Sequence, residues 1–206
     1  MNKYILILLF SCVCPATVAQ SQPAFDGPSW KPPYYLELDG WGIERFLIPI
    51  DFAPSIKYSG VEDVRFTRGW GDEKSPEYWS YAFLWLLDGN PTQTTAIIQK
   101  NLNVYYDGLV GRNITKRNIP KSLVIKTQTK LRAIKTEKGD LQTFAGTINM
   151  LDYMGQRPII LQALIHVKKC PGSSKTIVFY QVSPKLVTDP VWIKLKSLWA
   201  GFKCTV

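Results

Sequence analysis

Basic side chains recur at alternate positions in one stretch of the chain, at Lys126, Lys130 and Arg132. Because successive side chains of a strand point to opposite faces, this spacing predicts a strand with one cationic face. A meander of strands would bring His166 and Lys168 onto the same face. Such a face attracts anionic partners. We therefore expect these five residues to form a binding surface, although the solvated side of an antiparallel sheet has the same pattern.

Aromatic residues form a second candidate site. Trp41 lies between two glycines, and Trp70 lies in a glycine-rich turn, so both rings are expected to be accessible to a ligand. The segment 78–87 holds five further aromatic residues, but it is apolar at both odd and even positions. That pattern is typical of a strand covered on both faces, so we interpret it as core. The alternative is that 78–87 lines a pocket for a lipid or a sugar.

Signals of catalysis are weak. His166 is the only histidine, and its strand pattern places it on the wetter face of the sheet, partly exposed. The sequence contains no glycine-rich phosphate loop and no Gly-x-Ser-x-Gly motif. We therefore expect no catalytic residue, no metal and no cofactor, and we lean against an enzyme; a hydrolase remains the alternative. The carboxylates available for acid–base work are expected to be solvated, at turns and strand ends: Asp51, Glu62, Asp63, Asp72, Glu73 and Glu77.

The N-terminus has the features of an exported protein. Residues 1–19 combine Lys3, a short apolar run and small residues, which predicts a signal peptide, because a bilayer span needs about 20 apolar residues. A lipoprotein anchored through Cys12 is the alternative. We expect a periplasmic or secreted protein without a transmembrane helix. In such a compartment Cys170 and Cys204 are expected to form a disulfide, with two free thiols as the alternative.

Charge is divided unevenly along the chain. Residues 20–111 carry 7 basic and 12 acidic side chains, whereas residues 112–138 carry 9 basic and one acidic, and residues 157–203 carry 8 basic and one acidic. This asymmetry suggests an anionic partner, or two halves that attract each other within one fold. For an exported chain we expect anionic lipid head groups, acidic polysaccharide or another envelope protein, and no nucleic acid.

The expected elements form one α+β domain over 34–206, after a Pro/Gly-rich arm at 20–33. Helical periodicity predicts helices over about 92–110, ending at Gly111, and over about 190–202. Alternation and turn residues predict an antiparallel sheet of about six to eight strands. An Asp39–Gly40 turn would pair the first two, and a four-strand meander would end the sheet. The expected strands cover 34–38, 43–50, 61–68, 78–87, 123–135, 141–154, 159–169 and 176–183.

The order of these elements, with FLIPIDFAP (46–54) early and the amphipathic segment VWIKLKSLWAGF (191–202) at the end, resembles PsbP-type domains of exported proteins. The resemblance covers most of 43–203 as a pattern, without a specific motif. It implies a small non-enzymatic domain of the envelope or lumen, an accessory to larger assemblies. The aromatic strand and the two tryptophans of the last helix depart from that family, and no site residue is carried over.

These observations favour an exported, non-catalytic envelope domain that binds a partner or an anionic surface. A carrier of a small ligand, or a hydrolytic enzyme with a pocket beside 78–87, is the alternative.

Overall fold

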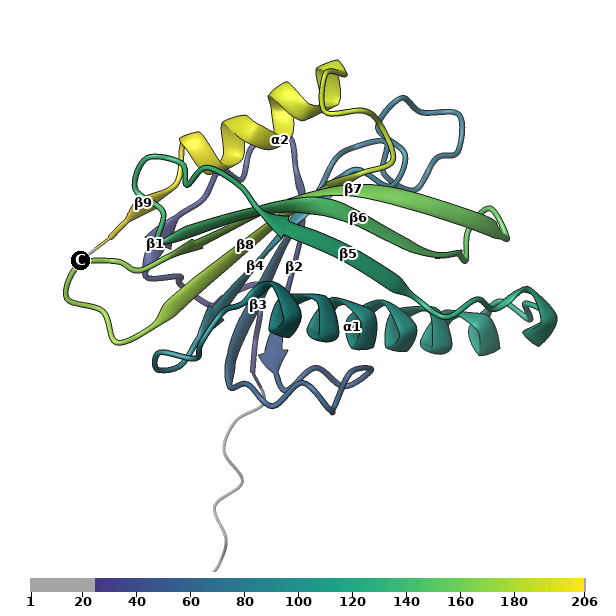
Figure 1. Cartoon of the computed structure of the whole chain (residues 1–206), viewed down its shortest axis with the longest axis horizontal. Coiled ribbons are helices and arrows are strands. Elements are labelled where there is room, and N and C mark those ends of the chain that lie inside the picture. Colours follow the sequence, from purple (N-terminus) through teal and green to yellow (C-terminus); the bar gives the residue numbers. More distant parts are fainter. Residues whose placement is uncertain (1–24, 206) are drawn as a thin grey trace, which may run out of the picture.

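Seven strands form one antiparallel sheet in the order β2-β3-β4-β8-β7-β6-β5, with one helix on each face (Figure 1). The computed structural model describes residues 25–205; the predicted signal peptide, Cys12 and the start of the arm lie outside the described residues. The predicted α+β fold and the closing four-strand meander β5–β8 are confirmed. The strands are β2 (Gly42–Ile48), β3 (Gly60–Phe66), β4 (Tyr81–Leu87), β5 (Gln128–Ala133), β6 (Gln142–Asp152), β7 (Arg157–Lys168) and β8 (Thr176–Ser183).

The aromatic strand β4 is buried along its whole length, as its pattern predicted. Tyr81, Phe83 and Trp85 belong to the core beneath helix α1 (Thr95–Lys116), whereas Leu84 and Leu86 belong to a second core beneath helix α2 (Pro190–Ala200). The sheet therefore separates two apolar cores. The strand is shorter than predicted because Trp79, with φ of 53°, leaves the extended conformation.

Helix α1 begins and ends later than its sequence predicted. The Thr94 side chain accepts a hydrogen bond from the N–H of Ile97, so Thr94 is the N-cap. The helix continues through Gly111 to Lys116, because Asn118, with φ of 53°, supplies the left-handed residue that ends it. The prediction of a stop at Gly111 was wrong, since a glycine inside a helix is tolerated.

Helix α1 is joined to the edge strand β5 by side chains. The backbone N–H groups of residues 127, 129 and 131 donate to Asp107, Asn103 and Gln99, at 2.8, 2.8 and 2.7 Å. On the other side of α1, a Cβ at Gly108 would collide with the carbonyl oxygen of Phe52. The helix thus bridges the β5 edge and the segment that follows β2.

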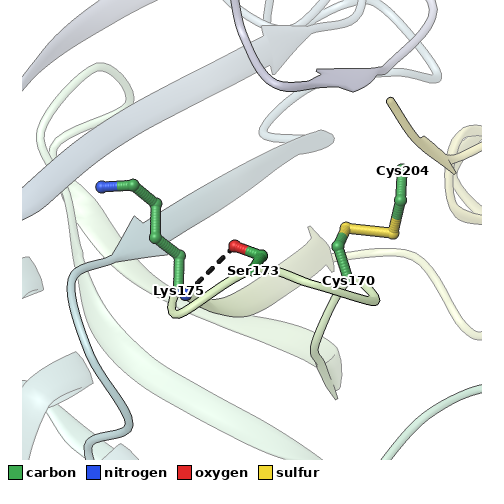
Figure 2. Close-up of a disulfide and its surroundings, with 4 residues drawn as sticks. All are labelled: Cys170, Ser173, Lys175 and Cys204. Atoms are coloured by element: carbon green, nitrogen blue, oxygen red, sulfur yellow. Dashed lines mark hydrogen bonds between the residues drawn. A yellow bond between two sulfur atoms is a disulfide. The ribbon is translucent and has the colours of Figure 1, made fainter. Parts of the chain in front are cut away.

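The two termini of the domain meet in a small ribbon. Strand β1 (Tyr34–Tyr35) pairs antiparallel with β9 (Lys203–Cys204), not with β2, so the hairpin predicted at Asp39–Gly40 does not form. Cys204 is bonded to Cys170 in the turn between β7 and β8, as predicted (Figure 2). In that turn the N–H of Lys175 donates to Ser173 Oγ at 3.1 Å. The disulfide between Cys170 and Cys204 fastens the C-terminal ribbon to the sheet.

Within residues 25–205, no helix is long and apolar enough to cross a membrane.

Replacing both Cys170 and Cys204 by alanine is expected to lower the free energy of unfolding by about 2–4 kcal/mol, because the bond closes a loop in the unfolded chain. The two residues lie 34 positions apart. Urea denaturation of the oxidised protein and the variant measures the difference. Reduced wild type should match the variant, and equal stability of oxidised and reduced protein would contradict the prediction.

Candidate functional site

A cavity of about 480 Å³ opens between α1 and the β2–β4 end of the sheet. It lies on the α1 side of the sheet, because four residues of α1 line it: Tyr105, Leu109, Arg112 and Asn113. Eight of its sixteen lining residues are aromatic, so a guest molecule would meet mainly ring faces and edges. The aromatic residues of the wall are Phe46, Phe52, Phe66, Trp70, Trp79, Tyr81, Tyr105 and Tyr153.

A buried carboxylate, Asp152, holds one wall of this cavity in place. It accepts hydrogen bonds from Trp79 Nε1 at 2.9 Å and from the Tyr78 hydroxyl at 2.8 Å. The N–H groups of Met154 and Gly155 donate to it as well, both at 2.8 Å. These bonds hold Trp79 in its left-handed backbone conformation, which is costly for a bulky residue. Rigid walls of this kind favour a binding site that is formed before the ligand arrives.

A second buried carboxyl group, Glu62, lies behind the cavity. Its two oxygens accept hydrogen bonds from the Tyr105 hydroxyl at 2.7 Å and from Trp85 Nε1 at 3.0 Å. No cation is paired with it among the described residues. Burial therefore raises the pKa of Glu62 from 4.5 to about 8, an effect that the two hydrogen bonds only partly offset. Since Tyr105 is part of the cavity wall, Glu62 fixes the position of that ring.

The rim of the cavity is polar. Arg112 on α1 pairs with Asp51 at 3.2 Å, and its guanidinium lies 5.9 Å from the centre of the Phe52 ring. Glu44 on β2 also lines the cavity and is exposed. Charged groups at the mouth and rings inside are suited to an amphipathic guest.

The two tryptophans predicted to contact a ligand lie close together but differ in their surroundings. Trp70 lines the aromatic cavity, with its ring stacked 4.4 Å from that of Phe66. Trp41 does not line it; the two residues share a shallower hollow beside the first. Trp41 packs against the α2-side core, with Lys194 Nζ 5.1 Å from its ring.

The predicted cationic surface is divided. Lys130 and Arg132 are exposed on β5. Lys126 is exposed two residues before the strand, and its Nζ lies 3.7 Å from Asp107 Oδ2. Lys168 instead places its Nζ over the ring of Trp199, at 5.2 Å. His166 is only 1% exposed, so the expectation of a partly exposed residue was wrong. Helix α2, which was predicted, covers it: the ring of Trp199 stacks on the His166 ring at 4.9 Å.

His166 belongs to a small buried polar cluster beneath α2. Its Nδ1 lies 2.7 Å from Asp140 Oδ2, and the ring of Trp199 stacks on it at 4.9 Å. Thr143 also donates to Asp140. Glu137 completes a set of three groups whose oxygen and nitrogen atoms lie within 4.8 Å of one another, the spacing of a metal site. The short Nδ1–Oδ2 contact is that of a hydrogen bond, so an ion would have to break it.

Part of the charge asymmetry is accounted for by ion pairs between the acidic and the basic parts of the chain. Five ion pairs join a basic residue of 112–203 to an acidic residue of 20–111, which supports mutual attraction of the two halves. The pairs are Arg112–Asp51, Lys126–Asp107, Arg157–Glu73, Lys175–Asp88 and Lys194–Glu77.

Sequence reasoning missed both carboxylates that support the cavity. Glu62 was expected to be solvated with Asp63, yet both are fully buried in the middle of β3. Asp63 accepts hydrogen bonds from Arg45 and Tyr34 on the opposite face of the sheet. The sequence held only a weak signal, because these acids are the second and third residues of the predicted strand 61–68.

Comparisons of the chain with models of protein families, with curated proteins and with solved structures found no match. The resemblance to PsbP-type domains therefore stays a prediction, and the proposals below rest on the geometry.

The buried Glu62 predicts a pH dependence of stability. Its pKa is raised on folding, so between pH 4.5 and 8 the folded state holds a proton that the unfolded state has lost. The free energy of unfolding should therefore fall as pH rises, by roughly 1 kcal/mol per pH unit from this group alone. Chemical denaturation of wild type and Glu62→Gln at several pH values isolates it. The difference between the two curves should change steadily across this window, and parallel curves would contradict a protonated Glu62.

Proposed function

We propose that this protein is an exported, non-catalytic binding domain whose aromatic cavity receives a bulky apolar group of its ligand. The observation that carries the proposal is the cavity itself. Its volume of about 480 Å³ falls within the ~300–1,000 Å³ of small-molecule sites. It combines an aromatic interior with a few charged groups at the rim, which is the composition that such sites use to hold and orient a ligand.

Non-catalytic binding is favoured by where the reactive groups lie. His166 is buried beneath α2, on the face of the sheet opposite the cavity. At the rim, Asp51 is paired with Arg112. Glu62 is held by two donors behind Tyr105 and has no access to the cavity interior. This arrangement supports recognition and carriage better than acid–base chemistry.

Export is favoured by the disulfide together with the predicted signal peptide. A bond between Cys170 and Cys204 is typical of a chain that folds in an oxidising compartment. The periplasm or the cell exterior is therefore the proposed location.

Replacing Trp70 by alanine is expected to weaken binding of the neutral aromatic probe N-phenyl-1-naphthylamine about tenfold, because one ring of the cavity wall is lost. Trp41→Ala removes a similar ring outside the cavity and serves as the matched control. Probe fluorescence measures both affinities, and circular dichroism verifies the fold. The absence of probe binding to wild type, or equal loss in both variants, would contradict the proposed site.

A second candidate function is docking of the β5 surface to anionic lipid head groups. Lys130 and Arg132 are exposed on the same side of β5, and Lys126 continues the row. No ion pair involves Lys130 or Arg132 among the described residues. Such a row gains affinity for an anionic surface from each charge, and salt weakens it.

Changing Lys126, Lys130 and Arg132 together to glutamate is expected to abolish binding to phosphatidylglycerol vesicles without changing the fold. The control variant makes the same charge change at Lys31, Lys57 and Lys74, which are exposed in the acidic half. Vesicle co-sedimentation at low and high salt measures binding. Equal loss in both variants would assign the effect to net charge and not to this surface.

A further inference from the structure

The polar atoms of the cavity wall are largely occupied within the protein. Glu62 accepts a hydrogen bond from the Tyr105 hydroxyl, and the Tyr81 hydroxyl bonds to a second tyrosine of α1 at 2.7 Å. Trp79 Nε1 donates to Asp152 at 2.9 Å. A guest molecule therefore meets the faces and edges of these rings, and finds few free partners for hydrogen bonds of its own.

The rings of the wall come from two groups that enclose the same space. One group joins the β3–β4 end of the sheet to the loop between these strands, with neighbouring ring centres 4.4 to 6.3 Å apart; it contains Phe66, Trp70, Trp79 and Tyr81. In the other group, Phe52 packs against Phe46 and Tyr105, with centres 6.4 and 5.1 Å away. Because both groups line the cavity, a compact guest can contact rings from more than one direction.

Two rings of the wall already hold cations of the protein itself. The guanidinium of Arg112 lies 5.9 Å from the centre of the Phe52 ring, and that of Arg117 lies 5.4 Å from the centre of the Tyr153 ring. Both rings line the cavity. The face of an aromatic ring carries negative charge density and attracts cations, and the attraction is stronger when water is excluded. The faces inside the cavity have the same property.

The charged residues of the cavity favour a positive guest as well. Of the three that line it, Arg112 is paired with Asp51, which leaves Glu44. Glu44 is exposed, and no ion pair involves it among the described residues. Burial is the main cause of the raised pKa of Glu62 behind the wall, and the charge of Glu44 adds to it. A field that opposes a second negative charge favours a positive one.

We propose that the ligand of the aromatic cavity is an organic cation, in which a quaternary ammonium group attached to an apolar body is enclosed by the rings beside Glu44. This inference rests on the proposed function and names the ligand class of the same site. The rings bind the cation through their faces, the carboxylate of Glu44 adds long-range attraction, and the remaining volume receives the apolar body.

Other ligand classes fit this wall less well. A sugar or a primary ammonium ion loses hydrogen bonds to water on entry, and the occupied polar atoms of the wall do not replace them. A quaternary ammonium ion has no N–H group and loses none. An anionic amphiphile would need Arg112, whose guanidinium is already engaged by Asp51 and Phe52, and it would be repelled by Glu44.

A pair of ligands of the same shape tests the inference. Benzyltrimethylammonium and neopentylbenzene differ only in that a neutral carbon replaces the charged nitrogen. Displacement of bound N-phenyl-1-naphthylamine, followed by its fluorescence, measures both affinities. We expect the cation to bind at least about fivefold more tightly than its neutral counterpart, which is within the range of cation–ring attraction in a desolvated site.

Removal of one charge separates the effect of Glu44 from that of net charge. Glu44→Gln should weaken binding of benzyltrimethylammonium about threefold and leave neopentylbenzene unchanged. Asp39→Asn is the matched control, because it also replaces an exposed carboxylate by an amide and lies outside the cavity. It should leave both affinities unchanged.

Replacement of one ring separates aromatic attraction from apolar contact. Trp70→Leu keeps an apolar side chain in the wall but removes the ring, so the ratio of cation affinity to neutral affinity should fall about threefold. Trp41→Leu makes the same change outside the cavity and should leave the ratio unchanged.

The outcomes distinguish this inference from the function on which it rests. Equal or tighter binding of neopentylbenzene to the wild type would overturn the cation as ligand, and binding of N-phenyl-1-naphthylamine would leave the cavity proposal standing. Equal losses in Glu44→Gln and Asp39→Asn would also overturn it, since net charge would then explain the preference. Failure of the probe and both ligands to bind would overturn both proposals.

Discussion

The side-chain attachment of α1 to the edge of β5 is the constraint on which the rest of this molecule depends. Acceptors on the helix at Gln99, Asn103 and Asp107 are four residues apart, which is about 6 Å along a helix. The amides that they meet on β5 are two residues apart, which is about 6.6 Å along a strand. The two spacings nearly match, so three bonds form in succession. With the helix fixed at that edge, another side of it faces the β2 end of the sheet, and the aromatic cavity lies between the two.

The aromatic interior also explains how this core tolerates acids. Glu62 and Asp152 are both fully buried. Moving a carboxylate from water into an apolar core costs much free energy unless hydrogen-bond donors replace the lost water. Tyrosine and tryptophan are the large apolar residues that carry a donor, so they can surround a carboxyl group and still pack. Asp152 receives four donors and Glu62 two. The tyrosines and tryptophans that make the core aromatic therefore also stabilise its buried carboxyl groups. The rings that Glu62 and Asp152 hold in place form part of the cavity wall.

Local patterns were sufficient to predict much of the fold but little of the site. A run that is apolar at both odd and even positions identified the buried strand β4. Alternation and turn residues identified the closing meander, and the two cysteines of an expected exported chain identified the disulfide. These signals are contained within a few residues or follow from the compartment. The pairing of β1 with β9 depends on residues far apart in the chain, and the end of α1 at Lys116 depends on a less common capping residue, Asn118. Glu62 was misread for the same reason, because its partners Trp85 and Tyr105 lie 23 and 43 residues away. Trp70 was identified as a ligand candidate only because glycines surround it.

The charge asymmetry acquires a spatial meaning once the sheet order is known. The acidic half supplies β2 and β3 at one edge, and the most basic segment supplies β5 at the other. Five ion pairs tie the halves together, but exposed pairs contribute little stability, so the asymmetry is not explained by folding alone. Glu44 on β2 and Lys130 on β5 are outside these pairs. The domain therefore has two distinct polar surfaces, an acidic one at Glu44 beside the aromatic cavity and a basic one along β5. A cavity and a charged group coincide beside β2, whereas charge alone marks the β5 surface, and this is why the cavity is the stronger candidate for recognition.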